Sequence, residues 1–189
     1  MAAKPILLDL PTELTTARLT LRVPTPGDGA TIHGAVRESL AELKPWMPWA
    51  TDTCCSDDGE EWCRRSAAQF LLGEQLNYMM FLKEDGIYVG NIGTHHIDWT
   101  VPKCEIGYWV RTSHTRLGVV SEAVSVLTEM LFSTAKMQRV SIRMDDRNEA
   151  SWRVAERCGY TLEGIYRNET RTHDGRLRDT RVYARTATP

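Results

Sequence analysis

The sequence predicts an α+β (mixed α/β) protein in which a mixed sheet of about seven strands is flanked by about four helices. Two observations predict this class. Strand alternation and helical periodicity follow one another in the order strand, two helices, three strands, helix, strand, helix, two strands. The chain has 189 residues, of which 42% are hydrophobic, and this suits one domain with a full core. Because the order is neither a Rossmann alternation nor an antiparallel sandwich, we expect helices on both faces of the sheet.

The N-terminal part is expected to hold a lead-in, a strand and a helix. Residues 1–16 are expected to be loose, and residues 18–23 alternate as a half-buried strand does. Two prolines end that strand and open a helix. The apolar face of this helix is expected at Ile32, Val36, Leu40 and Leu43. Prolines and tryptophans break the helix at residues 44–49.

A second helix and a hairpin are expected next. Asp57 or Asp58 is expected to cap the helix, and Gly73 suits the left-handed position that stops it. Residues 77–83 and 87–97 have the pattern of two strands that an Asp-Gly turn joins.

The rest of the chain alternates between strands and helices. Strands are expected over residues 104–111, 139–145, 160–167 and 178–185, and helices over residues 118–135 and 148–158. Asp174 and Gly175 are expected in the turn of the final hairpin.

Charge and composition restrict the partners and the compartment. A net charge of −2 gives no electrostatic case for nucleic acid as the main partner. No apolar run approaches the length of about 20 residues that spans a bilayer, and the N-terminus lacks the features of a signal peptide. The five cysteines are odd in number, scattered and without a zinc spacing. We therefore expect a cytoplasmic protein with reduced thiols, no metal and no membrane partner, as a monomer or a homodimer.

One strand-to-helix junction is suited to bind phosphate. The strand from Glu105 to Val110 leads through a short loop to Gly118, where a helix is expected to begin. The first N–H groups of a helix have no internal partner and lie at the positive end of its dipole. Such a junction can hold a pyrophosphate without a metal. With Asn148 and Ser151 further on, the pattern suggests a nucleotide-tailed cofactor whose reactive end lies near a second helix.

Several ordered motifs resemble the GNAT N-acetyltransferases, and most closely their RimJ/RimL branch. They are Arg18-Leu19-x-Leu21-Arg22, Pro45-Trp46-Met47-Pro48-Trp49, Glu105-Ile106-Gly107-Tyr108-Trp109, the Gly118 helix start, Asn148-x-x-Ser151 and Cys158-Gly159-Tyr160. The resemblance implies a single GNAT domain over residues 1–189, with its core at about 17–185. It also implies transfer of an acetyl group from acetyl-CoA, as co-substrate, to a primary amine by direct attack in a ternary complex. That branch acetylates protein N-terminal amines and includes small-molecule acetyltransferases, so both acceptor classes stay open.

The resemblance implies which residues bind the cofactor. They are Trp109, Val110, Arg111, Arg116, Leu117, Gly118, Val119, Val120, Ser121, Asn148 and Ser151. The family's pyrophosphate loop reads Gln/Arg-x-x-Gly-x-Gly/Ala, and this chain departs from it at Thr115 and Val120. Arg116 is expected to supply the missing charge. Because the N–H groups of the main chain bind the phosphate, the departures bear on affinity and not on the fold.

Two side chains are expected to carry the chemistry. By resemblance, backbone N–H groups near Trp109 and Val110 polarise the thioester carbonyl, and Ser151 donates to the leaving thiolate. Glu105 is the expected base, which takes the proton of the amine through a water. Glu169 is the second candidate for the base.

The acceptor site is expected to involve Trp46, Trp49, Tyr78 and His95. By resemblance, the segment with the two tryptophans walls this site. His95 and His96 are adjacent on a strand and are therefore expected to face opposite sides, so that one of them reaches the acceptor. The acidic cluster of Asp52, Asp57, Asp58, Glu60 and Glu61 leaves a cationic acceptor open.

Two other functions compete with acetyl transfer. The altered loop motivates a non-catalytic acyl-CoA-binding or sensing module, which would bind CoA and turn over no amine. An arginine-rich tail motivates a nucleic-acid-binding module, against which the net charge argues.

Overall fold

The computed structural model describes residues 4–172 and 175–187. Its strands are β1 (Glu13–Thr15), β2 (Leu19–Arg22), β3 (Tyr78–Leu82), β4 (Tyr88–Asp98), β5 (Lys103–Val110), β6 (Arg139–Asp145), β7 (Thr161–Arg171) and β8 (Leu177–Thr186). Its helices are α1 (Gly29–Glu38), α2 (Leu40–Leu43), α3 (Ser56–Leu72), α4 (Val119–Ser133) and α5 (Glu149–Arg157), with the 3₁₀ turns η1 (Pro5–Leu7) and η2 (Thr112–His114).

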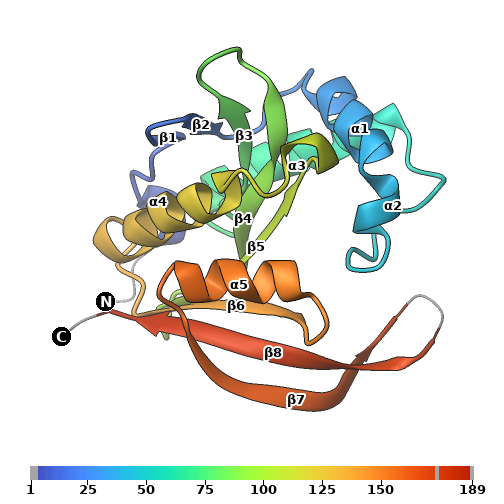
Figure 1. Ribbon diagram of the computed structural model, residues 1–189. Coiled ribbons are helices and arrows are strands. Elements are labelled where there is room, and N and C mark those ends of the chain that lie inside the picture. The colour runs from blue at the N-terminus through green and yellow to red at the C-terminus, as the bar shows by residue number, and fades with distance from the viewer. Residues whose placement is uncertain (1–3, 173–174, 188–189) are drawn as a thin grey trace.

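The described residues form one mixed sheet of eight strands, in the order β1-β2-β3-β4-β5-β6-β8-β7 (Figure 1). The pair of β5 and β6 is parallel, and the other neighbours are antiparallel. This confirms the predicted mixed α/β class. Gly73 caps α3 with a φ of 70°, as expected for the residue that ends a helix.

Three local predictions are wrong. The lead-in contains β1, in which Leu14 is buried opposite Leu21; the strand is too short for alternation to reveal it. The first helix is two helices, because the chain bends at Ser39, whose Oγ accepts a hydrogen bond from the amide of Thr112 at 2.9 Å. Cys55 is the N-cap of α3, where the sequence suggested an aspartate.

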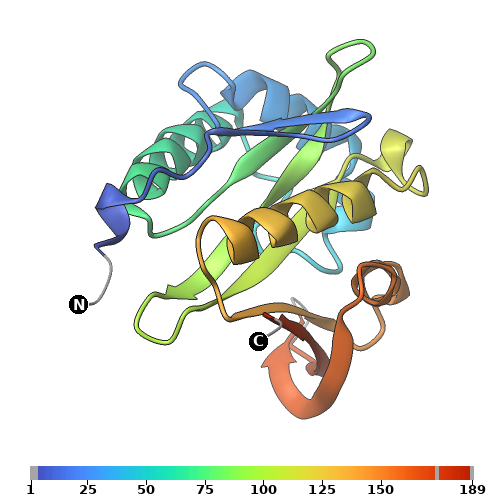
Figure 2. The ribbon, with the colours of Figure 1, turned by 90° about the vertical axis from the view of Figure 1, so that its left-hand side faces the viewer.

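The helices cover the sheet on both faces. Helix α4 packs Ala123 and Leu127 against the face of β5 that carries Ile106. Helices α1 and α3 lie across the sheet from α4 (Figure 2) and form a second core with Trp109 of the opposite β5 face. Strand β5 therefore lies between the two layers and contributes side chains to both.

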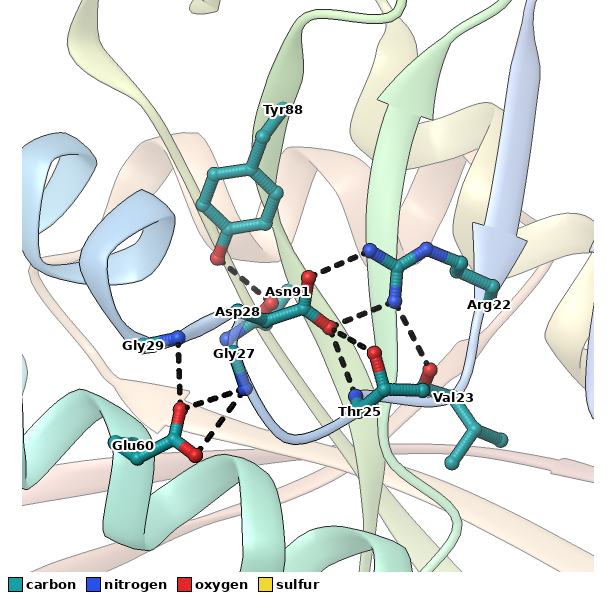
Figure 3. Close-up of polar contacts among 9 residues, drawn as sticks. All are labelled: Arg22, Val23, Thr25, Gly27, Asp28, Gly29, Glu60, Tyr88 and Asn91. Carbon is teal, nitrogen blue, oxygen red and sulfur yellow. Dashed lines mark hydrogen bonds and ion pairs between the residues drawn. The ribbon is translucent and has the colours of Figure 1, made fainter.

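Polar contacts hold the start of α1 to the sheet and to α3 (Figure 3). Arg22 of β2 forms two hydrogen bonds with Asp28, at 2.7 and 2.8 Å. The carboxylate of Glu60 on α3 accepts the amides of Gly27 at 2.9 Å and of Gly29 at 3.3 Å. Gly29 has to be glycine, because a Cβ there would lie 2.5 Å from the amide nitrogen of Glu60.

Strands β5 and β6 separate along their length, which positions the candidate site. Their pairing covers Lys103↔Arg139, Cys104↔Val140 and Glu105↔Ser141. Beyond Glu105, strand β6 continues to pair with β8 as far as Asp145, whereas β5 remains paired with β4 as far as Val110. The sheet therefore opens between β5 and β6, with α5 lying beside the opening (Figure 1).

Within the described ranges, 4–172 and 175–187, none of the helices has the length and apolar character needed to cross a bilayer.

Candidate active site

The main chain of β5 presents donors to the opening. The amide of Arg111 donates to the carbonyl of Val89 at 2.8 Å, so this position is hydrogen-bonded toward β4. Residues of an antiparallel pair alternate between hydrogen-bonded and non-hydrogen-bonded positions. The amides of Tyr108 and Val110 therefore point away from β4, while the amide of Trp109 points toward it. Of the two residues expected to donate here, the geometry favours Val110, with Tyr108 in place of Trp109.

The loop before α4 has the geometry of an anion site. Arg116 and Gly118 have positive φ angles of 63° and 78°. In the described structure no side chain caps the first turn of α4, which leaves its N–H groups available to a ligand. Gly118 is required by its φ angle and not by crowding, since a Cβ there would lie 3.5 Å from its nearest neighbour, on Arg18. These features fit a pyrophosphate.

Several side chains expected at the cofactor make other contacts. Val119 is buried in the core. Arg111 pairs with Glu38 at 2.5 Å, and the Oγ of Ser121 accepts a hydrogen bond from Arg157 at 2.9 Å. These positions therefore offer their main chain to a ligand more readily than their side chains.

The exposed part of the loop lies just before the helix. Arg116 and Leu117 are exposed, and Val120 is half-buried. The bulk of Val120, where the family pattern has a small residue, therefore does not prevent this backbone from forming the loop.

Arg18 braces this loop, a role that the sequence did not reveal. Its Nη1 donates to the carbonyl of Leu117 at 2.9 Å, and its Nη2 lies 2.7 Å from the carboxylate of Glu122. Glu122 also accepts the amide of Arg18 at 2.9 Å. The signal in the sequence is the motif Arg18-Leu19-x-Leu21-Arg22, which supports the resemblance and indicates no contact.

Asn148 and Ser151 lie together at the start of α5. The side-chain oxygen of Asn148 accepts the amide of Ser151 at 3.1 Å, so Asn148 caps the helix. This bond uses the oxygen, and the Nδ2 of Asn148 is a further donor. The cap and a contact with a cofactor amide are therefore compatible.

Tyr108 reaches from β5 to α5 and meets Ser151. Its hydroxyl lies 3.0 Å from the Oγ of Ser151 and donates to the carbonyl of Ser151, also at 3.0 Å. Burial raises the pKa of the Tyr108 phenol, so it stays protonated. Tyr108 was not among the site residues expected from the sequence. Alternation put it on the face opposite Glu105, but nothing in the sequence indicated that α5 lies over that face.

Glu105 lies where β5 and β6 separate. It belongs to the last pair of the two strands, and its side chain is 19% exposed. Burial raises its pKa, against the opposing effects of Arg143 and His96. A half-buried carboxylate with a raised pKa at the edge of an opening is a suitable base.

A β-bulge brings both histidines to the side of Glu105, so the expectation that they face opposite sides is wrong. The register runs from His95↔Glu105 to Asp98↔Lys103, which leaves one extra residue on β4. His96 has a φ of 51°, and its Nδ1 lies 3.5 Å from the carboxylate of Glu105. His95 is exposed to solvent on one side. The protein packed around the rest of its ring disfavours the charged form, and this desolvation, together with His96, lowers the pKa of His95.

Glu169, the second candidate base, forms an ion pair with Arg143. Hydrogen bonding to Arg143 lowers the pKa of Glu169, which makes its carboxylate a weaker proton acceptor than Glu105.

The three aromatic residues expected at the acceptor site lie in different surroundings. Trp46 lines a cavity of about 580 Å³ between the segment after α2 and the ends of β7 and β8. Trp49 is 45% exposed, and its ring centre lies 6.0 Å from that of Trp109. Tyr78 is fully buried, and its hydroxyl donates to the carbonyl of Pro11 at 2.7 Å. The expectation for Tyr78 is therefore wrong, because its ring is part of the core.

The turn of the final hairpin adjoins this cavity. Gly175 has a φ of 82°, as a turn glycine can. Asp174, expected beside it, lies outside the described residues.

Residues 18–161 match the family described as an acetyltransferase (GNAT) domain. The chain belongs to the GNAT acetyltransferase family. The ribosomal-protein-serine acetyltransferase of Escherichia coli (strain K12) is 28% identical over 149 residues, which are 77% of this chain and 82% of that protein. The predicted resemblance to the RimJ/RimL branch is confirmed.

Solved structures share the fold. RimL, the ribosomal L7/L12 alpha-N-protein acetyltransferase in complex with coenzyme A, has a TM-score of 0.85 at 21% identity, covering 94% of this chain and 97% of its own. The microcin C7 self-immunity acetyltransferase MccE, in complex with acetyl-CoA and AMP, has a TM-score of 0.84 at 20% identity, covering 91% and 94%. As a GNAT member, this chain is an acetyltransferase.

Proposed function

We propose that this GNAT acetyltransferase transfers the acetyl group of acetyl-CoA to the α-amine of a protein N-terminus, by direct attack in a ternary complex. The observation that carries the proposal is the opening between β5 and β6, which the uncapped start of α4 borders at one end and the Tyr108–Ser151 contact borders at its side. A thioester held there would lie between donors from two elements.

The chain's own groups suit the parts of acetyl-CoA. The N–H groups at Gly118 and the following turn suit the pyrophosphate, with Arg116 exposed beside them. The free β5 edge, including the amide of Val110, suits the amides of the pantetheine arm and the thioester carbonyl. The Nδ2 of Asn148 is placed to bind the arm from the side of α5.

The reaction has three steps, and groups of this chain have a role in each. Glu105 accepts a proton from the incoming ammonium, directly or through a water, so that the amine nitrogen can attack the thioester carbonyl. The Val110 amide stabilises the negative charge that develops on the carbonyl oxygen. As the C–S bond breaks, Ser151 donates its hydroxyl proton to the thiolate sulfur, and the second proton that the former amine nitrogen loses restores the Ser151 hydroxyl. While the Ser151 oxygen is short of its proton, the Tyr108 hydroxyl can turn its own proton from the Ser151 carbonyl to that oxygen, which limits the charge there.

An α-amine suits this site better than a lysine side chain. The α-amino group has a pKa of about 7.7–8.0, against about 10.4 for lysine. At neutral pH a much larger fraction of the α-amine is already neutral, so a carboxylate of modest basicity is sufficient. The names of the E. coli relative and of RimL, both acting on ribosomal proteins, support the same acceptor class.

A mass-spectrometric assay tests the acceptor. A peptide with a free N-terminus and an internal lysine is incubated with acetyl-CoA, next to the same peptide with its N-terminus formylated. We expect one acetyl group, on the α-amine, and no reaction of the formylated peptide. Acetylation of the lysine alone, or reaction of small amines but of no peptide, would refute the proposed acceptor. CoA binding without turnover of any amine would favour the non-catalytic module.

A further inference from the structure

Three parts of the chain line the open cavity beside Trp46. Its volume of about 580 Å³ lies in the range of small-ligand sites. Arg147, in its wall, directly precedes Asn148, which caps the helix that carries Ser151. The cavity therefore lies at the N-terminal end of the helix that carries Ser151. The cavity lining includes Lys44, Trp46, Asp52, Arg147, Thr172 and Arg176.

Among the charged residues of the walls, cations outnumber carboxylates. A smaller cavity of about 90 Å³ shares Trp46 and Thr172 with the first and adds two arginines. The cations of both cavities are Lys44, Arg147, Arg171, Arg176 and Arg178. The carboxylates that form ion pairs with them are Asp52 and Asp145. Glu169, whose own ion-pair partner is Arg143, also attracts Arg178.

These carboxylates do not balance the cations. Asp145 is shared, at 2.8 Å from Arg147 and 3.7 Å from Arg178. Arg171 donates to the carbonyl of Gly175 at 2.7 Å, a contact that brings no charge. Lys44 pairs with Asp52 at 2.5 Å, which neutralises both. Even with Asp174, which lies outside the described residues, counted from the sequence as one more negative charge, cations remain in excess.

The acidic cluster in the sequence does not offset this excess. Glu60 and Glu61 pair with Arg64 and Arg65, and Asp58 accepts a hydrogen bond from the Cys55 amide, so these three carboxylates cap and brace α3. Asp52 lies in the cavity lining and is the partner of Lys44 already counted.

A positive surrounding has two effects on an amine substrate. It lowers the pKa of the bound ammonium, which favours the neutral nucleophile. It also repels a substrate whose only charge is that ammonium. An acceptor with negative charges of its own close to the amine is attracted to the site and not repelled, while the pKa of its ammonium is still lowered there.

We propose that the acceptor is an acidic N-terminal peptide, whose carboxylates, within a few residues of the α-amine, are bound by the cationic walls beside Trp46. The inference rests on the proposed function, because it concerns the same acceptor site. Charge complementarity of this kind acts mainly on the encounter of enzyme and substrate and is weakened by salt.

Three peptides of equal length test the proposal. They share the N-terminal residues Ser-Ala and the C-terminus, and differ at positions 3–5, which are all Glu, all Gln or all Lys. Initial rates of thiol release at saturating acetyl-CoA give kcat/KM for each peptide. At low ionic strength we expect the Glu peptide to exceed the Gln peptide by about tenfold, with the Lys peptide slowest. In 0.5 M NaCl we expect the three values to converge to within about threefold.

A charge-reversed variant locates the effect. In Arg171→Glu/Arg176→Glu we expect the order of the Glu and Lys peptides to reverse, with the Gln peptide changed by less than about threefold. The matched control, Lys103→Glu/Lys136→Glu, makes the same change in net charge. Its two positions lie near the opposite end of β6, where Lys103 of β5 is the strand partner of Arg139. This control should keep the wild-type order of the peptides. Arg171→Gln is the milder variant if the double variant fails to fold.

Equal kcat/KM for the three peptides at low salt, a faster Lys peptide, or an unchanged order in folded Arg171→Glu/Arg176→Glu would each overturn this inference and leave the proposed function intact. Thiol release with none of the peptides would refute the proposed function, and this inference with it.

Discussion

The hydroxyl of Tyr108 on β5 lies 3.0 Å from the Oγ of Ser151 on α5, across the opening between β5 and β6. The two residues are 43 positions apart in the chain. This contact fixes where the serine hydroxyl lies, and it connects the strand that would hold the thioester to the helix that would protonate the thiolate.

Tyr108→Phe removes that hydroxyl and should lower kcat. The ring stays in the core, so the fold and the KM for acetyl-CoA should change little. We expect kcat to fall by about tenfold, as for the loss of one positioned hydrogen bond. Ser151→Ala should lower kcat by at least as much, and the double variant should be no slower than Ser151→Ala. Steady-state rates of the three variants measure this, and additive effects would show that the two hydroxyls act independently.

Glu105→Gln should remove the acidic limb of the pH–rate profile. In the wild type, burial raises the pKa of Glu105, and the base works only when deprotonated, so the rate should rise as pH increases through that raised pKa. A glutamine does not titrate, so the remaining rate should lack this limb. Glu169→Gln is the comparison, because pairing with Arg143 lowers the pKa of Glu169. A wild-type profile in Glu105→Gln would place the base elsewhere.

Gly118→Glu should weaken the binding of CoA by about tenfold or more, because a carboxylate at the start of α4 repels phosphate and opposes the helix dipole. Gly159→Glu is a matched control. Gly159 has a φ of 77°, like the 78° of Gly118, and a Cβ there would meet nothing within 4 Å. The two variants therefore share the backbone strain and differ in position. Calorimetric titration with CoA compares them; equal losses would mean that strain, and not the phosphate site, is responsible.

Asp28→Asn should lower the free energy of unfolding by about 1.5–3 kcal/mol at pH 7, the range for hydrogen bonds to charged groups. Hydrogen bonding to Arg22 lowers the pKa of Asp28 in the folded state. Its contribution is therefore complete above its unfolded pKa of about 3.9 and is lost as pH falls through the lower folded value.

Urea unfolding from pH 7 to pH 2 measures the effect of Asp28→Asn. The difference between wild type and variant should shrink below about pH 4. Asp52→Asn, in the exposed pair with Lys44, should leave stability nearly unchanged, because solvent screens such a pair. A difference at Asp28 that does not depend on pH would mean that packing, and not the ion pair, stabilises this corner of the fold.

Periodicity predicted most of the fold, and local backbone irregularities account for what it missed. Arg139–Asp145 is the strand that the sequence predicts, because Val140, Ile142 and Met144 alternate on a buried face. The bulge at His96 was not visible, because one extra residue with a positive φ leaves no mark in an apolar pattern.

The candidate site was predictable where the chemistry is in the backbone and less so where side chains meet across the fold. The Gly118 junction follows from a glycine before a helix. The Tyr108–Ser151 contact, the Arg18 brace and the Arg143–Glu169 pair join elements whose proximity only the tertiary structure reveals. Tyr78 shows the reverse error, since an aromatic residue near the start of a strand belongs to the core as readily as to a site.

Acetyl transfer to an α-amine is measured most directly by thiol release from acetyl-CoA with and without an N-terminal peptide, together with calorimetric CoA binding by the same preparation. We expect CoA to bind and thiol to be released only when the free α-amine is present, one thiol for each acetylated peptide. CoA binding without amine-dependent release, or no CoA binding at all, would contradict the proposed function.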